Sequence, residues 1–314
     1  MAASRPVNIV RVRAFAKINL SLRVTGVRAD GYHTLDTTFQ SLALHDTITI
    51  SARPGPMRLF CSDPACPGGE DNLVWRAAAR VWSAAHRSGA PHGVAIRIRK
   101  RIPTEAGLGG GSSDGAAALR AFARFWRVKL SSRKIEAIAR ALGADVPYFL
   151  TGGTARGLGR GDRLRPLPDA PRAWVVLAIP RFGVSTRQAC DWWDRARRRA
   201  SGREHEVRSA REASASGGGA PRESQECRDI LNDLERVVAA KQPEIARLVR
   251  ALTRLGARQA AMSGSGSAVF GLFDTRRAAV RAARALAGRP GARIVTRTLD
   301  RGRYEELGAP HLPR

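Results

Sequence analysis

The stretch of sequence that decides the fold reads Pro103-Thr104-Glu105-Ala106-Gly107-Leu108-Gly109-Gly110-Gly111-Ser112-Ser113-Asp114. Its glycines allow tight turns, some at positive φ, that a β-carbon would penalise. Before it, apolar and polar residues alternate over residues 94–99, which predicts a strand. After it, apolar residues recur with helical spacing at Leu119, Phe122, Ala123 and Trp126. This order of strand, glycine loop and helix directs backbone N–H groups and the positive helix end at one small volume, which suits a phosphate.

The glycine loop matches neither of two common phosphate-binding motifs. No Gly-Lys-Ser/Thr follows the glycines, so it is not a Walker A motif, and Ser112 stands where a dinucleotide fingerprint has its third glycine. The glycines alone leave two readings open, a phosphate site and a plain strand-to-helix turn. The longer pattern P-x-x-x-G-L-G-G-G-S-S-D is far more specific than the glycines alone.

Length and composition describe an ordinary globular protein. At 314 residues with 43% hydrophobic content, we expect two domains, each with its own core. No apolar run approaches the roughly 20 residues of a membrane span. Residues 1–10 lack the apolar segment of a secretory signal and are short for a transit peptide, so we expect a cytoplasmic protein.

The formal net charge of +27 raises the question of nucleic-acid binding. The basic residues are spread along the chain and are mostly arginine, densest at residues 97–101 and 195–199, without interleaved aromatic residues. We interpret them as a general arginine bias on solvated surfaces, which also suits phosphate-bearing ligands. The cysteines (Cys61, Cys66, Cys190 and Cys227) form no C-x-x-C pair, so neither a metal site nor a disulfide framework is indicated.

The first half of the chain reads as strands followed by helices. We predict strands at residues 10–22 and 46–50, a Pro- and Gly-rich loop at 53–69, and helices from Asp71 to near Gly89 and from Ser131 or Ser132 to Gly143. Lys17 in the first strand reads as an exposed strand residue. Asp145 reads as the N-cap of a short helix with Pro147 near its start.

A proline-rich segment at residues 164–171 predicts a domain boundary, which we place between residues 1–168 and 169–314. The second part begins with a buried strand at 174–179, then a helix through Trp192 and Trp193. Residues 200–225 are charged and of low complexity, so we expect a flexible insertion without a core role. Helices at 229–240, 243–255 and 275–287 and a strand at 293–298 complete a two-layer α+β unit.

The glycine-loop pattern resembles the nucleotide-binding loop of the GHMP kinases, the superfamily of galactokinase, homoserine kinase, mevalonate kinase and phosphomevalonate kinase. Within it, further segments resemble the 4-diphosphocytidyl-2-C-methyl-D-erythritol kinases of the non-mevalonate isoprenoid pathway. They are Ala16-Lys17-Ile18-Asn19-Leu20, Arg28-Ala29-Asp30-Gly31-Tyr32-His33, Gly143-Ala144-Asp145-Val146-Pro147, Asn232-Asp233-Leu234-Glu235 and Met262-Ser263-Gly264-Ser265-Gly266. The A-D-G-Y-H segment separates this family from mevalonate and homoserine kinases.

The resemblance implies an α+β fold of two domains. The N-terminal domain would bind the nucleotide and carry the catalytic residues, and the C-terminal domain would be a ferredoxin-like two-layer unit. The implied reaction is ATP-dependent phosphorylation of the substrate's 2-hydroxyl, with Mg²⁺. By the same resemblance, Asp145 is the general base and Lys17 lies beside it, either polarising the hydroxyl or mainly orienting it.

The resemblance also implies the binding residues. The ATP phosphates would contact Pro103, Gly107, Leu108, Gly109, Gly110, Gly111, Ser112, Ser113 and Asp114. The substrate would contact Asn19, Tyr32, His33, Gly264, Ser265 and Gly266, with Tyr32 stacked on cytosine and His33 at its edge. Many relatives complete the cytosine sandwich with an aromatic residue where this chain has Cys190, near Phe182, Trp192 and Trp193. The metal ligands stay unknown, with Ser113 or water as candidates.

The sequence leaves two rival functions open. One is another small-molecule kinase of the same superfamily, of the mevalonate or homoserine type. The other is a nucleic-acid-binding protein that keeps the fold without activity, although the Lys17, Asp145 and glycine-loop matches argue against it. We expect a small-molecule substrate, no nucleic-acid or membrane partner, and a monomer or weak homodimer.

Overall fold

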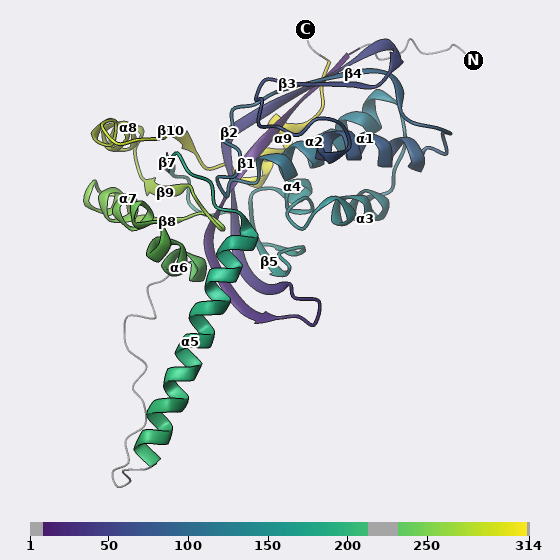
Figure 1. Ribbon diagram of the computed structural model, residues 1–314. Helices are drawn as coiled ribbons and strands as arrows, with labels where there is room; N and C mark the ends of the chain where they lie inside the picture. The colour runs from purple at the N-terminus through teal and green to yellow at the C-terminus, as the bar shows by residue number, and fades with distance from the viewer. Residues whose placement is uncertain (1–8, 213–231, 313–314) are drawn as a thin grey trace.

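The computed structural model describes residues 9–212 and 232–312, with the backbone alone for residues 200–212. Two sheets lie side by side, each covered by helices, and one long helix projects away from them (Figure 1). We call each sheet with its helices a lobe. Among the described residues, no helix is both long and apolar enough to cross a membrane.

The first lobe is built on a six-stranded sheet. Its strands are β1 (Ile9–Val27), β2 (His33–Pro56), β3 (Arg58–Cys61), β4 (His92–Arg99), β5 (Thr154–Gly159) and β6 (Arg163–Pro166). The order is β3-β4-β2-β5-β6, with β1 also paired to β2, and only the β3–β4 pair is parallel. Its helical segments are η1 (Gly69–Asp71), α1 (Leu73–Ala84), α2 (Gly110–Phe125), α3 (Ser132–Leu142) and α4 (Tyr148–Thr151).

Local sequence explains the central part of this lobe. In β4 the side chains of Val94, Ile96 and Ile98 are buried while the arginines between and after them are exposed, as the alternation predicts. Helix α3 begins at the predicted cap, where the Ser131 hydroxyl accepts a hydrogen bond from the backbone N–H of Lys134. The predicted strand, glycine loop and helix are therefore present in that order.

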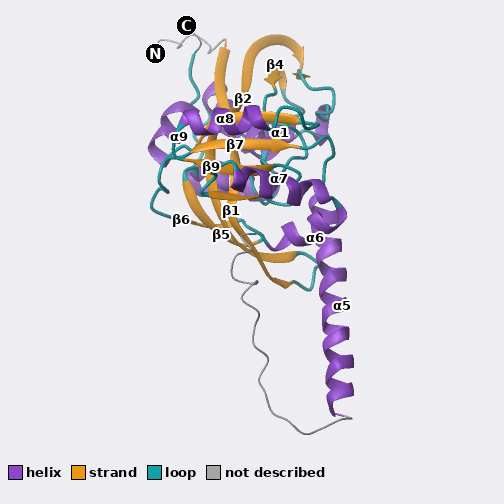
Figure 2. Cartoon of the chain, turned by 90° about the vertical axis from the view of Figure 1, so that its left-hand side faces the viewer, coloured by secondary structure: helices purple, strands orange, loops and turns teal. Residues whose placement is uncertain are grey.

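The second lobe holds a four-stranded antiparallel sheet in the order β10-β7-β9-β8. Its elements are β7 (Trp174–Ile179), α5 (Thr186–Glu212), α6 (Asp233–Lys241), α7 (Pro243–Arg254), β8 (Gln259–Met262), β9 (Val269–Phe273), α8 (Arg276–Ala285) and β10 (Ala292–Arg297). This arrangement matches the ferredoxin-like order implied by the resemblance. In Figure 2, α7 and α8 cover the outer face of the sheet.

The lobes share a core and are not separate globules. Apolar side chains of both sheets pack together, with Ile18 and Leu42 of the first sheet against Val175, Leu177 and Phe270 of the second. After β10 the chain returns to the first lobe as α9 (Arg301–Gly308), which contacts β1. The chain passes from the first sheet to the second between β6 and β7, and the division at residues 168 and 169 remains a proposal.

The structure corrects several local predictions. The segment 53–69 is not all loop, because β2 continues to Pro56 and β3 pairs with β4. Asn72, not Asp71, caps α1, and α1 ends at Ala84. Asp145 caps no helix, since Pro147 stands at the N-cap of α4. The α5 backbone is helical to Glu212, so the predicted flexible insertion begins as helix, and its residues 213–225 lie outside the described part.

Candidate active site

One large cavity, about 1330 Å³ in volume, lies between the lobes. Its walls come from β1, the β1–β2 hairpin, the glycine loop, the segment before α4, the first turns of α5 and the β8–β9 turn. Residues more than 200 positions apart in sequence, such as Lys17 and Ser265, therefore face one volume. The sequence segments that matched one kinase family converge here.

The glycine loop is packed tightly on both sides. A β-carbon at Gly107 would overlap the carbonyl oxygen of Ser263, and one at Gly109 would lie 2.7 Å from the Phe149 ring. Both glycines have positive φ, +72° and +70°. The loop is held to β1, because the backbone N–H of Lys17 donates to the carbonyl oxygen of Leu108 at 3.0 Å. These glycines are thus required by the fold itself.

Beyond the loop, the start of α2 opens onto the cavity. Gly110, Gly111 and Ser112 line the wall, and a β-carbon at Gly111 would meet nothing within 4 Å. The unpaired N–H groups and positive end of a helix N-terminus favour an anion at such a place. Pro103, Gly107, Leu108 and Gly109 line the same wall. This open wall fits the phosphates of a nucleotide.

Lys17 and Asp145 meet across the cavity wall, with Nζ 3.7 Å from Oδ2. The Lys17 residue is only 4% exposed, and Nζ donates to Asn19 Oδ1 at 2.7 Å. Asn19 is held in turn, because its Nδ2 donates to Thr37 Oγ1 at 2.7 Å. Burial lowers the pKa of Lys17, and the nearby Asp145 carboxylate only partly offsets burial.

Asp145 differs from its partner in that its side chain is 35% exposed and lines the cavity. Asp145 belongs to the short segment between α3 and α4. The C-terminus of α3 precedes this segment, and Pro147, the N-cap of α4, follows it. A carboxylate that is partly exposed beside a buried ammonium group is placed to accept a proton from a bound hydroxyl.

The residues predicted to contact the base, Tyr32 and His33, lie at the β1–β2 hairpin and line the cavity. Tyr32 is 59% exposed at the cavity, and the guanidinium carbon of Arg160 lies 5.7 Å from its ring centroid. His33 also lines the cavity, with Nε2 2.9 Å from Oδ1 of Asp194 on α5. Cys190 lines it as well, but Phe182, Trp192 and Trp193 are not among the described residues that do.

The β8–β9 turn supports the floor of the cavity. The Ser263 hydroxyl donates to the carbonyl oxygen of Gly107 at 3.0 Å, and Asn232 Nδ2 donates to the carbonyl oxygens of Met262 and Gly264 at 2.9 and 2.8 Å. Gly264 and Ser265 line the cavity. Gly266, predicted with them, is not among the described lining residues.

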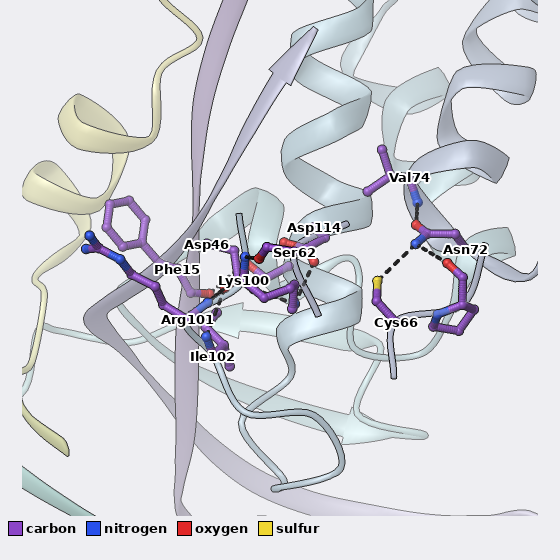
Figure 3. Close-up of polar contacts among 12 residues, drawn as sticks. Phe15, Asp46, Ser62, Cys66, Asn72, Val74, Lys100, Arg101, Ile102 and Asp114 are labelled. Atoms are coloured by element: carbon purple, nitrogen blue, oxygen red, sulfur yellow. Dashed lines mark hydrogen bonds and ion pairs between the residues drawn. The ribbon is translucent and has the colours of Figure 1, made fainter. Parts of the chain in front are cut away.

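Ser113 and Asp114 point into the protein body and not into the cavity. Ser113 Oγ donates to the carbonyl oxygen of Phe15 at 2.7 Å, so this hydroxyl already has a partner. Figure 3 shows Lys100 between Asp46 and Asp114, with Nζ 2.5 and 2.8 Å from their Oδ2 atoms. Asp114 Oδ1 is buried without a hydrogen-bond partner among the described residues.

In the cluster of Asp46, Lys100 and Asp114, burial and the neighbouring opposite charge shift the pKa values in opposite directions. Burial raises the pKa of Asp114 to about 7, although Lys100 acts to lower it. Burial lowers the pKa of Lys100, but the charges of Asp114 and Asp46 outweigh burial and the net pKa is raised. Asp46 also accepts hydrogen bonds from the backbone N–H groups of Arg101 and Ile102. The cluster therefore fixes the residues that lead into the glycine loop.

Sequence reasoning missed four residues of this region. Lys100, Arg160 and Asp194 line the cavity and Thr37 supports Asn19, yet none of them stood out in the sequence analysis. Their partners lie far away in the chain, so periodicity and spacing carry no signal for them. No group of three or more His, Cys, Asp or Glu side chains that could hold a metal ion occurs among the described residues.

Comparison with known proteins gives consistent matches. Residues 72–153 match the family model described as GHMP kinases N terminal domain, and residues 211–292 match GHMP kinases C terminal. The 4-diphosphocytidyl-2-C-methyl-D-erythritol kinase of Moorella thermoacetica is 40% identical over 93% of this chain and 100% of the relative. The kinase of the same name from Gloeobacter violaceus is 40% identical over 91% of this chain and 92% of the relative.

Solved structures agree with the sequence matches. A crystal structure of 4-(cytidine 5'-diphospho)-2C-methyl-D-erythritol kinase is 34% identical, with a TM-score of 0.69 over 92% of this chain and 98% of that chain. The L. major mevalonate kinase has a TM-score of 0.65 over 95% of this chain and 99% of that chain, at 18% identity, which shows a shared fold alone.

Proposed function

This chain belongs to the 4-diphosphocytidyl-2-C-methyl-D-erythritol kinase family of the GHMP kinases. We propose that it transfers the γ-phosphoryl group of ATP to the 2-hydroxyl of 4-diphosphocytidyl-2-C-methyl-D-erythritol, giving the 2-phosphate and ADP. The observation that carries the proposal is the Lys17–Asp145 pair, 3.7 Å apart on the wall of the cavity that the glycine loop and the A-D-G-Y-H hairpin also line.

The proposed mechanism assigns the proton to Asp145. Its carboxylate accepts the proton of the substrate hydroxyl as the oxygen attacks the γ-phosphorus and the bond to the β-phosphate oxygen breaks. Lys17 keeps its ammonium group beside both partners, favouring the ionised carboxylate and the developing charge on the hydroxyl oxygen. Asn19 orients Lys17 through the 2.7 Å hydrogen bond. Positioning and charge neutralisation supply most of the catalysis in such transfers.

The nucleotide phosphates would lie against Gly110, Gly111 and Ser112, where the α2 N-terminus opens onto the cavity. Mg²⁺ commonly enters such sites bound to substrate phosphates and needs few protein ligands. Thr104, Glu105 and Ser112 are loop residues with side-chain oxygens that line the cavity, and such oxygens would suit Mg²⁺. When bound, Mg²⁺ would neutralise phosphate charge. The substrate base would stack on Tyr32. A cytoplasmic location and a monomeric or weakly dimeric state remain predictions.

The test is ADP release by the purified protein with Mg-ATP and the cytidyl substrate, beside Asp145→Asn. We expect turnover that depends on the cytidyl substrate, and a loss of about 10²-fold or more in kcat for Asp145→Asn. Asp274→Asn, an exposed carboxylate of the second lobe, is the matched control and should keep full activity. Turnover with mevalonate or homoserine instead would overturn the substrate assignment, and full activity in Asp145→Asn would overturn the base.

A further inference from the structure

His33 and Asp194 join the two lobes at the cavity wall. His33 is the first residue of β2, and Asp194 lies in the third turn of α5, 161 positions later. The His33 Nε2 and Asp194 Oδ1 atoms are 2.9 Å apart, and the two side chains are 9% and 27% exposed. An ion pair or hydrogen bond this sheltered is screened less by water than a surface pair.

A second contact fixes the imidazole from another direction. The Trp193 ring meets it edge to face, with centroids 5.6 Å apart and an interplanar angle of 87°. Trp193 packs on the core of the second lobe, and the guanidinium carbon of Arg197 lies 5.3 Å from its ring centroid. The second lobe therefore holds His33 through two adjacent residues of α5.

The same face of α5 forms one wall of the cavity. Arg187, Cys190, Asp191 and Asp194 recur with helical spacing and all line it. Cys190 lines this wall with a thiol, which offers far less stacking surface than an aromatic ring. Recognition of a base here must therefore depend more on groups that contact its edge.

Asp194 determines what His33 can offer to such an edge. In a neutral imidazole one nitrogen donates and the other accepts, and a carboxylate partner holds the proton on the nitrogen it contacts. With Asp194 at Nε2, a neutral His33 ring keeps its proton on Nε2 and its lone pair on Nδ1. A lone pair accepts from the amino group of cytosine and repels the carbonyl oxygen that uracil carries at the same position.

We propose that Asp194 is a positioning residue that sets the base specificity of the site through His33. The proposal rests on the proposed function, because it takes the cytidyl group as the ligand of this wall. Asp194 touches no reacting atom in this role. It fixes the position and tautomer of His33, so that the site accepts an amino-bearing pyrimidine and rejects one with a carbonyl group there.

The kinetic test compares the parent with Asp194→Ala and Asp194→Glu, using the cytidyl substrate and its uridyl analogue. Asp194→Ala removes the hydrogen bond between His33 and a charged group, so His33 is no longer held in position. KM for the cytidyl substrate should therefore rise about tenfold or more. The cytidyl preference in kcat/KM should fall by a similar factor, while kcat and KM for ATP change less than about threefold. Asp194→Glu should restore part of the preference, and Asp274→Asn should leave every value unchanged.

A double-mutant cycle tests whether Asp194 acts through His33. Adding Asp194→Ala to His33→Ala should produce no further rise in KM, because the interaction is already gone. Long-range ¹H–¹⁵N spectra, with His33 assigned by its loss in His33→Ala, report the tautomer without any turnover. The parent should show the Nε2-protonated pattern at neutral pH, and Asp194→Ala should lose it.

The proposal would be overturned by an unchanged cytidyl preference in Asp194→Ala, by full additivity with His33→Ala, or by the same tautomer in the parent and Asp194→Ala. A drop in kcat and a rise in KM for ATP together, with a lower melting temperature, would instead indicate a purely structural role and also reject it. If the proposed function is wrong, the parent shows no cytidyl turnover, yet the spectra still test the Asp194–His33 pair.

Discussion

Lys17 is subject to two opposing influences, since burial disfavours its charge and Asp145 favours it. Burial is the larger, so the pKa of Lys17 lies below its ordinary value of 10.5. A lysine that must be protonated loses its effect as pH rises through the lowered pKa. The role assigned to Lys17 therefore has a consequence at alkaline pH.

We expect kcat/KM for the cytidyl substrate to fall on the alkaline side at a pH below 10.5. Lys17→Arg should work more slowly, because a guanidinium group has a different shape, but its alkaline decline should disappear since arginine stays charged. The measurement is the pH profile of kcat/KM, with the exposed Lys129→Arg as control. An identical alkaline decline in Lys17→Arg would show that another group titrates.

Asp46 and Asp114 share one lysine but differ in what each supports. Asp46 is fully buried and accepts from the Lys100 ammonium group and from the backbone N–H groups of Arg101 and Ile102, so truncating its side chain leaves three donors without this partner. Asp46→Ala should lower the free energy of unfolding by about 3 kcal/mol or more. Denaturant unfolding at pH 8 measures it, and a loss below about 1 kcal/mol would contradict the assignment.

Asp114→Asn should behave differently, because the native state disfavours the Asp114 charge. The pKa of about 7 lies above the unfolded value near 3.8, so the native state binds more protons between these pH values. The contribution of Asp114 to the unfolding free energy should therefore fall as pH rises from about 4 to 7, so over this range the parent should lose stability relative to Asp114→Asn. At pH 8 Asp114→Asn should be at least as stable as the parent. A large loss at pH 8 would show that the charged pair with Lys100 is stabilising.

Among the elements, the glycine loop contains glycines that the fold requires and others that can be changed to test nucleotide binding. A methyl group at Gly107 would overlap the carbonyl oxygen of Ser263, and a residue with a side chain would be strained at the positive φ of this position. A methyl group at Gly111 would meet only open space. Gly107→Ala should destabilise the protein by about 1–3 kcal/mol.

Gly111→Ala should leave the melting temperature unchanged or slightly raised, yet increase KM for ATP about tenfold if phosphate lies against this wall. Thermal melts and nucleotide kinetics of both variants separate these effects. An unchanged KM for ATP in Gly111→Ala would place the phosphates elsewhere.

The elements also show what sequence could predict and what it could not. The strand, loop and helix around the glycines follow from local periodicity and from the glycines themselves, and these were predicted correctly. Strand β3 was missed because Pro and Gly residues predicted a loop, whereas pairing with β4 overrides that local preference. The cap expected at Asp145 was wrong, since its side chain faces the cavity. The contacts of Asp194 and Lys100 depend on tertiary structure, which no local pattern encodes.

At the scale of the whole molecule, the two lobes depend on each other. Their sheets share an apolar core, and the last helix crosses back to the first lobe. There Tyr304 is buried against Phe15 and Gly152, and its hydroxyl donates to the carbonyl oxygen of Phe149 at 2.7 Å. The cavity lies between the lobes, so its geometry depends on both remaining folded together.

This coupling predicts a single unfolding transition for both lobes. Tyr304→Ala removes a buried ring and should cost about 3–5 kcal/mol, while Tyr304→Phe loses only the hydrogen bond and should cost about 1 kcal/mol. Because the sheets share a core, hydrogen exchange should rise by the same factor in the most protected amides of β2 in the first lobe and β9 in the second. Leu312→Ala, an exposed apolar residue near the same end, is the control and should change neither. If β9 kept its protection while β2 lost it, the lobes would be independent folding units, and cavity geometry would depend on their docking alone.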